Sequence, residues 1–556
     1  AFEKCLNLDT VTINSSKLSI GKAAFNGCVK LSDVTLPEGL TSIGETSFAG
    51  TAIKNVTIPS SVTTIDKQAF KDSTLGANNG KIIFALNGDG KSALSKIGDE
   101  AFAGTKLSEF ALPETTGSLA LGAKIFKGCL ALTKVHISSS VTDIGTAFDG
   151  GIEITDVEVD GDKFMVTGGM LTNVKSDKSY DTIYYVFGQL DLKDGVLTIP
   201  EGVTSIGDRA FLGYTDIKKL VLPSTLNKLG ENAFQNCTGI EIIEFKNGSP
   251  SLTSISKYAF AGCKALKEIN LPGTITAVSD YAFDDCASLA NLSMPGVVTI
   301  GIYSFRNTAI ENLVLGSNVT TIEKNAFENS KIKSVSFNAK LKTIGNYAFQ
   351  NTLLTSVNIT ASITSIGSYA FCNNYNLASV TFADNGSLTS IGSSAFKATA
   401  ISGVEIPATV TTLGSSVFEN CSNLTNVVFK GNAISTIGTA AFANTAIQSI
   451  VIPDSVTTIE SGAFQDCTAL TEVKLSSNLK TMATISSRAT TANKGSVFEG
   501  CTSLEYIDLP ESLTYMGTFT FRNSGLKRIT IPANVKFLAV KEALPSAMSG
   551  STGTYF

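Results

Sequence analysis

A phenylalanine recurs along the whole chain at almost constant spacing, and this period limits what the sequence can fold into. Most intervals between these anchor phenylalanines are 22 or 23 residues, and from Phe283 to Phe371 the step is 22 four times running. A chain of 556 residues exceeds what one hydrophobic core normally serves, whereas a stack of short repeats has no such limit. We therefore predict a repeat solenoid. The anchors, mostly preceded by Ala or Ser, are Phe2, Phe25, Phe48, Phe70, Phe102, Phe126, Phe148, Phe211, Phe234, Phe260, Phe283, Phe305, Phe327, Phe349, Phe371, Phe396, Phe418, Phe442, Phe464, Phe498 and Phe521.

Each unit contains the signals of two short extended stretches and one turn. It reads Phe-x-x-Cys-x-x-Leu-x-x-Val-x-Ile-Pro, then Val-Thr-x-Ile-Gly and the next Ala-Phe. Val56, Thr57 and Ile58 alternate with the period of a strand that buries one face, and Pro59 ends that strand because proline has no N–H for a ladder. In Val-Thr-x-Ile-Gly we expect a second strand, whose Gly adopts a positive φ at a corner. The Ala-Phe segment is too short for an α-helix and predicts a turn or a 3₁₀ segment.

The period is interrupted in four places, which suggest how the chain is organised. Two intervals are longer than the period and contain extra residues of loop-like composition, "LGANNGKIIFALNGDGKS" after Phe70 and "MATISSRATTANKG" after Phe464. The repeat pattern decays after Ile531. The longest gap holds "GGMLTNVKSDKSYDTIYYVFGQ", which predicts a β-hairpin with a polar turn inserted into the stack. We expect the first part of the solenoid at 1–150, an irregular repeat with the hairpin at 151–199, and a second part with a degenerate end at 200–556.

Composition excludes several classes of protein. Charged residues make up 16% of the chain, below the usual value of about 25%, and the net charge of −5 offers no basic face for a nucleic acid. No run of about 18 apolar residues indicates a membrane-inserted segment. Because the sequence begins within a repeat, at "AFEKC", we interpret it as part of a longer protein from which export signals were lost.

These motifs resemble one known family. Ile-Gly-x-x-Ala-Phe, as at Ile344 to Phe349, Cys at the third position after Phe, and Val-x-Ile-Pro at the end of the strand are similar to the BspA-like leucine-rich repeats of surface proteins from host-associated bacteria and some parasitic protists. The hairpin before "LTIPEGVTSIGDRAF" (197–211) also resembles one of that family. The resemblance implies a right-handed, mostly β, leucine-rich-repeat-like solenoid of about 20 coils. It also implies a cell-surface or secreted protein that binds host matrix proteins, cell-surface proteins or glycans, and it supplies no catalytic residues.

The ten cysteines follow the repeat rather than a metal-binding pattern. Nine lie three residues after an anchor, where other units carry Thr, as at Thr105 and Thr445. Exchange with Thr is typical of a small buried position, so we expect free core thiols. A disulfide between neighbouring coils, such as Cys263 with Cys286, is the alternative. No Cys-x-x-Cys or other ligand cluster indicates a metal site, and we predict no cofactor. The nine are Cys5, Cys28, Cys129, Cys237, Cys263, Cys286, Cys421, Cys467 and Cys501.

Catalytic motifs are not evident. His136 is the single histidine and occupies an outward position of a strand, which leaves little for acid–base or triad chemistry. Two carboxylates suffice for a glycosidase, but the acids are scattered, and we interpret Asp284 and Asp285 as solvated residues of a turn. We therefore predict a protein that is not an enzyme.

The middle position of the first strand forms an outward column that can act as a binding face. The column is small, neutral to mildly acidic and lacks the Trp and Arg of tight interfaces, which predicts weak, extended or multivalent contact. Its members are Thr35, Thr57, Ala111, His136, Glu158, Val221, Glu244, Asn270, Ser293, Val314, Ser336, Asn358, Thr381, Glu405, Val428, Val451, Lys474, Asp508 and Thr530.

The hairpin is the second candidate binding surface. Its "TIYYVF" carries Tyr184 and Tyr185, a residue type enriched at interfaces, although both can instead pack the hairpin onto the solenoid. The candidate binding residues are therefore Tyr184, Tyr185, Glu405, Val428, Val451 and Lys474. We expect adhesion or protein or ligand binding at a cell surface or after secretion; the alternative is a structural spacer that displays another domain.

Overall fold

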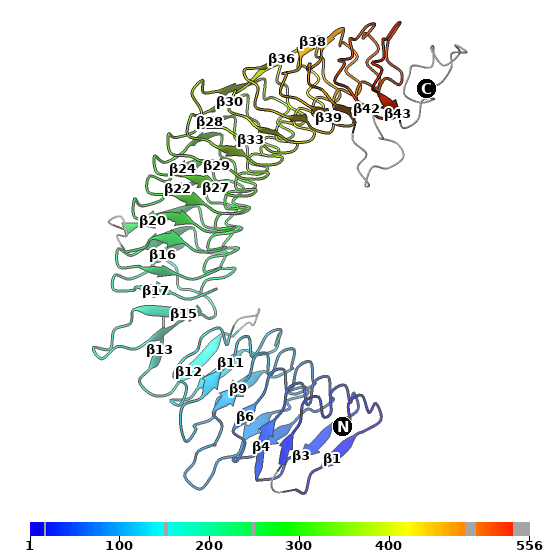
Figure 1. The fold of residues 1–556 in the computed structure, drawn as a ribbon. Coiled ribbons are helices and arrows are strands. Elements are labelled where there is room, and N and C mark those ends of the chain that lie inside the picture. The colour runs from blue at the N-terminus through cyan, green and yellow to red at the C-terminus, as the bar shows by residue number, and fades with distance from the viewer. Residues whose placement is uncertain (16–17, 149–153, 247–250, 484–495, 538–556) are drawn as a thin grey trace. The chain divides into compact units, whose positions relative to one another are not determined.

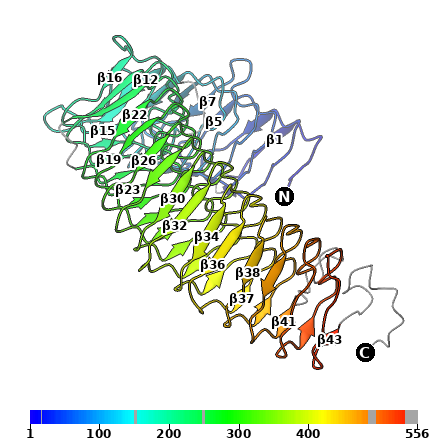
Figure 2. The same cartoon turned by 90° about the horizontal axis from the view of Figure 1, so that it is seen from above.

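The structure, a computed structural model, describes residues 1–15, 18–148, 154–246, 251–483 and 496–537. It is a parallel β-solenoid of about 20 coils, and no α-helix forms among these residues. Each regular coil contributes one strand to a row that we call the first-strand row and one to the second-strand row (Figures 1 and 2). The chain divides into two compact units, 1–194 with 199–212 and 225–233, and 195–198 with 213–224 and 234–556.

The first unit holds the N-terminal coils. Its first-strand row consists of β1 (Thr10–Thr12), β3 (Asp33–Thr35), β5 (Val56–Ile58), β7 (Ile82–Phe84), β9 (Glu109–Ala111), β11 (Lys134–Ile137) and β12 (Asp156–Val159). Its second-strand row consists of β2 (Leu18–Ile20), β4 (Leu40–Ile43), β6 (Thr64–Ile65), β8 (Lys96–Ile97) and β10 (Ala120–Leu121). A further sheet of this unit has the order β13 (Phe164–Thr167), β14 (Met170–Asn173), β15 (Thr182–Val186), β17 (Ser205–Ile206) and β19 (Lys228–Leu229).

The second unit repeats the same two rows over more coils. Its first-strand row consists of β16 (Val196–Thr198), β18 (Lys219–Leu222), β20 (Ile242–Phe245), β22 (Glu268–Asn270), β24 (Asn291–Ser293), β26 (Asn312–Val314), β28 (Ser334–Ser336), β30 (Ser356–Ile359), β32 (Ser379–Phe382), β34 (Gly403–Ile406), β36 (Asn426–Phe429), β38 (Ser449–Val451) and β40 (Glu472–Lys474). Its second-strand row consists of β21 (Ser254–Ile255), β23 (Ala277–Val278), β25 (Thr299–Ile300), β27 (Thr321–Ile322), β29 (Thr343–Ile344), β31 (Ser365–Ile366), β33 (Ser390–Ile391), β35 (Thr412–Leu413), β37 (Thr436–Ile437), β39 (Thr458–Ile459), β41 (Thr481–Met482), β42 (Tyr515–Met516) and β43 (Lys536–Phe537).

The anchor phenylalanines form the buried column that the period predicts. In the second unit, neighbouring rings stack almost parallel, as Phe305 does on Phe327 with centroids 5.5 Å apart and planes 6° apart. Phe70 stacks on Phe102 at 5.6 Å although the intervening coil is ten residues longer than the usual one. All described anchors are buried except Phe2, which begins the column and is 51% exposed. Loop length is therefore absorbed outside the core.

The Ala-Phe segment is a turn rather than a helix because its amides bond to the next coil. The N–H groups of Asn325, Phe327 and Asn329 donate to the carbonyl oxygens of Asn346, Ala348 and Gln350 at 2.9 Å each. An α-helix would use these donors within its own segment. The turn thus adds a third hydrogen-bonded ladder beside the two rows of strands, and it satisfies buried backbone groups that a short helix would leave unpaired.

Positive φ angles occur on both sides of the anchor phenylalanine, whereas the Gly of Val-Thr-x-Ile-Gly, where we expected them, has one only at Gly145 (φ 47°). The residue two positions after the anchor is usually Gly, Asn or Asp, as at Gly50 (φ 67°) and Asn329 (φ 57°), which are the residues that tolerate this region best. The Gly of the second strand instead allows close approach: a Cβ on Gly345 would lie 2.7 Å from the backbone carbon of Glu323 in the preceding coil.

Eight of the nine cysteines that follow an anchor are buried free thiols, as predicted, whereas Cys5 is free but exposed. All ten cysteines are free thiols, so the alternative disulfide between Cys263 and Cys286 does not form. The Sγ of Cys286 donates to the carbonyl oxygen of Phe260, the anchor of the preceding coil, at 3.2 Å. A threonine at this position also bonds to an anchor carbonyl: Thr445 Oγ1 donates to the carbonyl oxygen of its own anchor, Phe442, at 2.8 Å. It lies 3.2 Å from Cys467 Sγ in the next coil. These polar atoms are paired within the core.

Two of the irregular segments predicted from the sequence fall partly outside the described residues. These are the loop at 484–495 and the C-terminal tail from 538 onward. The boundaries expected at 150 and 199 stay a prediction, and residues 149–153, at the first of them, also lie outside the described part. The excess after Phe70 is not all loop, since Ile82, Ile83 and Phe84 within it form β7 and pair in register with β5.

Removing one ring from the column should destabilise the coils around it. Phe327 is fully buried between Phe305 and Phe349, so Phe327→Ala should cost about 3–5 kcal/mol by leaving a cavity. Hydrogen exchange of the surrounding amides measures this local loss, because repeat proteins open section by section. Phe2→Ala, at the exposed start of the column, is the matched control and should have a much smaller effect. Equal effects of the two variants would contradict the column's role.

Thiol titration should separate one accessible cysteine from nine protected ones. Cys5 is exposed and the other nine are buried. Burial raises the pKa of Cys237 to about 12 and that of Cys467 to about 11, so almost no thiolate is present at pH 8. The native protein should therefore react at Cys5 alone and the denatured protein at all ten. Rapid native labelling of several thiols would contradict the buried column.

Candidate functional site

The outward column of the first-strand row lies where the repeat predicts it. Parallel register places Glu405 opposite Val428 and Val451 opposite Lys474. All of its members are exposed or half-buried except Val221, which is 6% exposed.

Val221 corrects the expectation of a continuous outward column. Lys219 and Glu244 flank it on the same face, one two residues earlier on its own strand and the other directly opposite on β20. Their side chains form an ion pair of 2.7 Å across that face. The column is therefore interrupted at β18.

Three of the six candidate residues line one hollow on this face. The hollow measures about 450 Å³ and lies over β36 and β38, between the segments 426–432 and 449–454, with Lys474 of β40 beside it. Val428 and Val451 belong to the apolar part of its lining, together with neighbours such as Phe429. Val451 is 60% exposed, an unusual position for a valine of a parallel sheet. The structure thus brings Val428, Val451 and Lys474 together.

Charged groups at the rim of this hollow are held in place by neighbours. Glu405 does not line the hollow but its Oε1 lies 3.0 Å from Lys430 Nζ, which does. Asp454 Oδ1 accepts hydrogen bonds from the backbone N–H and the hydroxyl of Ser477, each at 2.8 Å. These two bonds hold the pKa of Asp454 below its usual value. The hollow therefore combines an apolar floor with a fixed carboxylate and two ammonium groups.

A second hollow on the first-strand row, in the first unit, has a different character. It measures about 300 Å³ and contains the outward residues Ala111, His136 and Glu158. Its charged groups are paired with one another: Lys134 Nζ lies 2.6 Å from Glu158 Oε1, and Lys81 Nζ lies 3.0 Å from Glu109 Oε1. His136 Nε2 lies 2.8 Å from Oδ2 of Asp160, which is outside the hollow. His136 is an outward side chain, as predicted. Because each charge has a partner, this hollow offers fewer free groups to a ligand than the one at β36 and β38.

The inserted segment is a hairpin that has become part of the solenoid. β14 and β15 pair antiparallel, with Leu171 opposite Tyr185, and β13 adds a third antiparallel strand that the sequence did not suggest. β15 then pairs in parallel with β17, placing Ile183 beside Ile206. The polar turn predicted between the two strands spans 174–181. The hairpin is therefore joined to the second-strand pattern of the first unit by its last strand.

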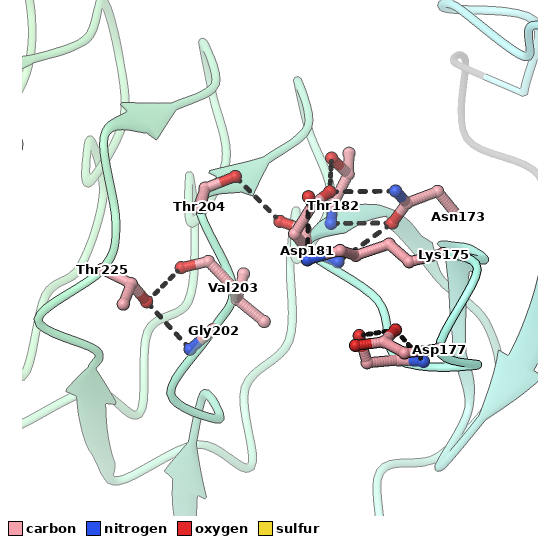
Figure 3. A network of polar contacts seen from close by, with 10 residues as sticks. Asn173, Lys175, Asp177, Asp181, Thr182, Gly202, Val203, Thr204 and Thr225 are labelled. Atoms are coloured by element: carbon pink, nitrogen blue, oxygen red, sulfur yellow. Dashed lines mark hydrogen bonds and ion pairs between the residues drawn. The ribbon is translucent and has the colours of Figure 1, made fainter.

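A polar network fixes the hairpin against the next coil (Figure 3). Asn173 Oδ1 accepts the backbone N–H groups of Asp181 and Thr182 at 3.1 and 2.9 Å, and its Nδ2 donates to Asp181 Oδ1 at 2.9 Å. Thr204 Oγ1 donates to the carbonyl oxygen of Asp181 at 3.3 Å. Asn173 thus closes the base of the turn, and Thr204 connects that base to the coil of β17.

The two candidate tyrosines of β15 have different roles. Tyr185 is 6% exposed, its hydroxyl donates to the carbonyl oxygen of Gly145 at 2.9 Å, and its ring packs edge-on against the anchor Phe148 at 5.8 Å. Its side chain continues the aromatic core where no anchor phenylalanine is available, so it cannot belong to a binding face. Tyr185 therefore follows the alternative interpretation, in which the tyrosine packs the hairpin onto the solenoid.

Tyr184 is half-buried at the edge of that core and lines a third hollow. This hollow measures about 750 Å³ and lies between the segments 161–165 and 173–178. Tyr184 packs edge-on against Phe164 at 5.7 Å, and partial burial raises its pKa. Three lysines, Lys163, Lys175 and Lys178, line the same hollow. Sequence reasoning missed them because scattered lysines of a turn carry no signal until the hairpin pairs its strands.

The remaining candidates for chemistry have structural partners. Asp284 is not a solvated acid: it is 8% exposed and accepts two hydrogen bonds from Arg306, from Nε at 2.8 Å and from Nη2 at 2.7 Å. Its neighbour Asp285 lies 3.6 Å from Lys264 Nζ. Within the described ranges, no group of three or more His, Cys, Asp or Glu side chains is placed to hold a metal ion. The part of the chain that the structure describes contains no helix long and apolar enough to cross a membrane.

Comparison with known proteins identifies the repeat. The family model of the BspA type leucine rich repeat region matches six times, at residues 1–77, 89–176, 182–300, 298–425, 389–490 and 482–541. A comparison with curated proteins found no match.

Solved structures of bacterial repeat proteins are similar to the chain. A leucine-rich repeat protein from Bacteroides ovatus ATCC 8483 is 26% identical with a TM-score of 0.52, over 67% of this chain and 90% of that one. A leucine rich cell surface protein from Faecalibacterium prausnitzii A2-165 is 23% identical with a TM-score of 0.30, over 68% and 90%. The pneumococcal vaccine antigen PcpA is 18% identical with a TM-score of 0.34, over 75% and 86%. The matches to the family model cover almost the whole sequence, and the chain belongs to the BspA-type leucine-rich repeat family.

Proposed function

We propose that this chain is a non-catalytic binding protein, located at a cell surface or secreted, that uses its first-strand row for adhesion. The observation that carries the proposal is the hollow over β36 and β38, where Val428 and Val451 expose apolar surface beside Lys474. Exposed apolar side chains on a polar face favour association with a protein partner. The family supports a repeat protein for binding or display.

The ligand class follows from the chemistry of this hollow. It offers an apolar floor, two ammonium groups and the carboxylate of Asp454, without an enclosed cavity. Such a surface fits an exposed segment of a host matrix or cell-surface protein better than a small molecule, because small ligands are usually enclosed on most sides. The hollow in the hairpin, with three lysines and Tyr184, provides a second contact for an acidic segment of the same partner or of a glycan.

A structural spacer is the second candidate function. The paired charges of the hollow around His136, including Lys134 with Glu158 at 2.6 Å, favour it, since a face that satisfies its own charges has little to offer a ligand. The two functions differ in one observable. A binding protein has a partner among matrix proteins or glycans, whereas a spacer has none while its coils remain folded.

Charging the apolar part of the hollow should weaken binding. We expect Val428→Glu with Val451→Glu to weaken binding at least about tenfold, or about 1.4 kcal/mol, because both carboxylates would lose water on association. Surface plasmon resonance against immobilised fibronectin, laminin, collagen and sulfated glycans measures the effect. Val314→Glu is the matched control, since Val314 has the same place in the repeat, is 67% exposed and lies outside the hollow. Equal losses in control and double variant, or no binding to any member of the panel, would contradict the proposed face.

The contribution of the hairpin should be tested without deleting it. Deletion of 163–187 would remove β15 and with it the partner of β17. The variant Lys178→Glu with Tyr184→Ser changes two residues of the hollow and keeps the strand. If the hairpin contacts the ligand, affinity should fall at least about tenfold, while Lys193→Glu, an exposed lysine outside the hollow, should leave it unchanged. An unaltered affinity in a folded variant would assign binding to the first-strand row alone.

A further inference from the structure

A stack of tyrosines runs along the turns of the second unit, outside both candidate surfaces. In five of six consecutive coils the residue two positions before the anchor is tyrosine: Tyr258, Tyr281, Tyr303, Tyr347 and Tyr369. Tyr258 and Tyr281 stack with centroids 4.5 Å apart, Tyr281 and Tyr303 at 4.9 Å, and Tyr347 and Tyr369 at 4.8 Å. Asn325 occupies the position in the coil between the two stacks. All five side chains are half-buried, so part of each ring reaches the surface.

The backbone does not require tyrosine at this position. Its φ is positive in these coils, 59° at Tyr347 and 58° at Tyr369, a region that bulky residues seldom adopt and that Asn adopts more readily. Asn232 and Asn325 take the same conformation at the same place in the repeat. A run of tyrosines in a conformation that disfavours them indicates a use for the side chains.

A ladder of asparagines lies two residues after the four successive anchors from Phe305 to Phe371. Asn329 Nδ2 donates to Asn307 Oδ1 at 3.2 Å, Asn351 to Asn329 at 2.9 Å, and Asn373 to Asn351 at 3.0 Å. These asparagines are exposed or half-buried. Two residues further along, the same turns expose Leu353 (39%) and Tyr375 (70%). The tyrosine stack and the asparagine ladder therefore run together in the coils of Phe349 and Phe371.

The coils of Phe349 and Phe371 combine these side chains with an absence of charge. The turn segments 345–353 and 367–375 contain no Asp, Glu, Lys or Arg. Charged residues flank them, with Glu323, Lys324 and Glu328 on one side and the ion pair of Lys397 with Glu419 on the other. An uncharged centre rich in tyrosine with a charged rim is the composition of a protein–protein interface. We call this surface the ladder edge; it consists of Tyr347, Asn351, Leu353, Tyr369, Asn373 and Tyr375.

Ring stacking limits what the ladder edge can bind. Tyr347 and Tyr369 each cover one face of the other, with centroids 4.8 Å apart. Lys324 Nζ lies 5.9 Å from the Tyr347 centroid, and the Arg306 guanidinium lies 4.6 Å from that of Tyr303. These stacked tyrosines offer mainly ring edges and hydroxyls, and a sugar would find one widely exposed ring to stack on, that of Tyr375. A protein surface that meets rigid edges and amides fits better, since such tyrosines lose little conformational entropy on binding.

We propose that the ladder edge binds the ladder edge of a second copy of this chain. Its tyrosine, its asparagine and its exposed large side chain recur at the same places in both of its coils, and a partner with the same period can match both coils at once. A second copy has that period and allows an isologous contact about a two-fold axis. The turn segments of the six coils from Phe260 to Phe371 carry five basic and five acidic residues, so like charges do not oppose the contact. The dimer leaves the first-strand row out of the contact and doubles the number of proposed adhesive faces.

Sedimentation of the full chain tests the proposal. The protein should show a reversible monomer–dimer equilibrium below about 100 μM. Leu353→Lys with Tyr375→Lys places four ammonium groups in the contact, and the dimer dissociation constant should rise at least about tenfold. Both side chains are exposed, so the fold is expected to persist, which circular dichroism and the thiol titration would check. Leu130→Lys is the matched control, because Leu130 also lies four residues after its anchor, is 76% exposed and belongs to the first unit.

Two results would overturn the proposal. One is a monomer at all concentrations up to about 100 μM. The other is a dimer that the double variant leaves intact or that Leu130→Lys weakens equally. Neither result bears on adhesion through the first-strand row, which is measured by binding to matrix proteins.

Discussion

Each coil depends on the contact that its anchor phenylalanine makes with the anchor of the next coil. A single unit of 22 residues cannot bury its apolar side chains alone, and stacking supplies the missing cover. Rings such as Phe305, Phe327 and Phe349 repeat at 5.4–5.5 Å, and the backbone N–H groups of the same turns bond to the next coil. Ring stacking and backbone hydrogen bonds to the next coil thus stabilise the same turn. Insertions are tolerated because they leave this column in place, as the spacing from Phe70 to Phe102 shows.

Much of the fold was predictable because the period itself encodes contact between like residues. The anchors, the two strands and the buried thiols all follow from a position that recurs with constant chemistry. The positive φ angles two residues after the anchors could also have been predicted, because Gly, Asn or Asp recurs at that position. We placed the positive φ at the wrong Gly because close approach and a left-handed turn both select glycine. Coordinates alone distinguish them.

Candidate binding surfaces were predictable only where the repeat fixes the direction of a side chain. The outward direction of Val428, Val451 and Lys474 follows from strand alternation, and the structure gathers all three at one hollow. Tyr185 could not be assigned in this way, since its burial depends on β15 joining the solenoid. The tyrosines before the anchors are visible as a column when the units are aligned, but their stacking is a property of the assembled coils. Repetition therefore builds faces and edges rather than an enclosed pocket, which suits binding or display.

Native-state hydrogen exchange tests the central claim that the turns are held by coil-to-coil bonds as firmly as the strands are. The informative amides are those of Phe305, Phe327 and Phe349, whose N–H groups donate to the next coil. They should exchange as slowly as the amides of β27 and β29, since both open only when neighbouring coils separate. Exchange of these three at the rate of a solvated loop, while the strands stay protected, would contradict the account.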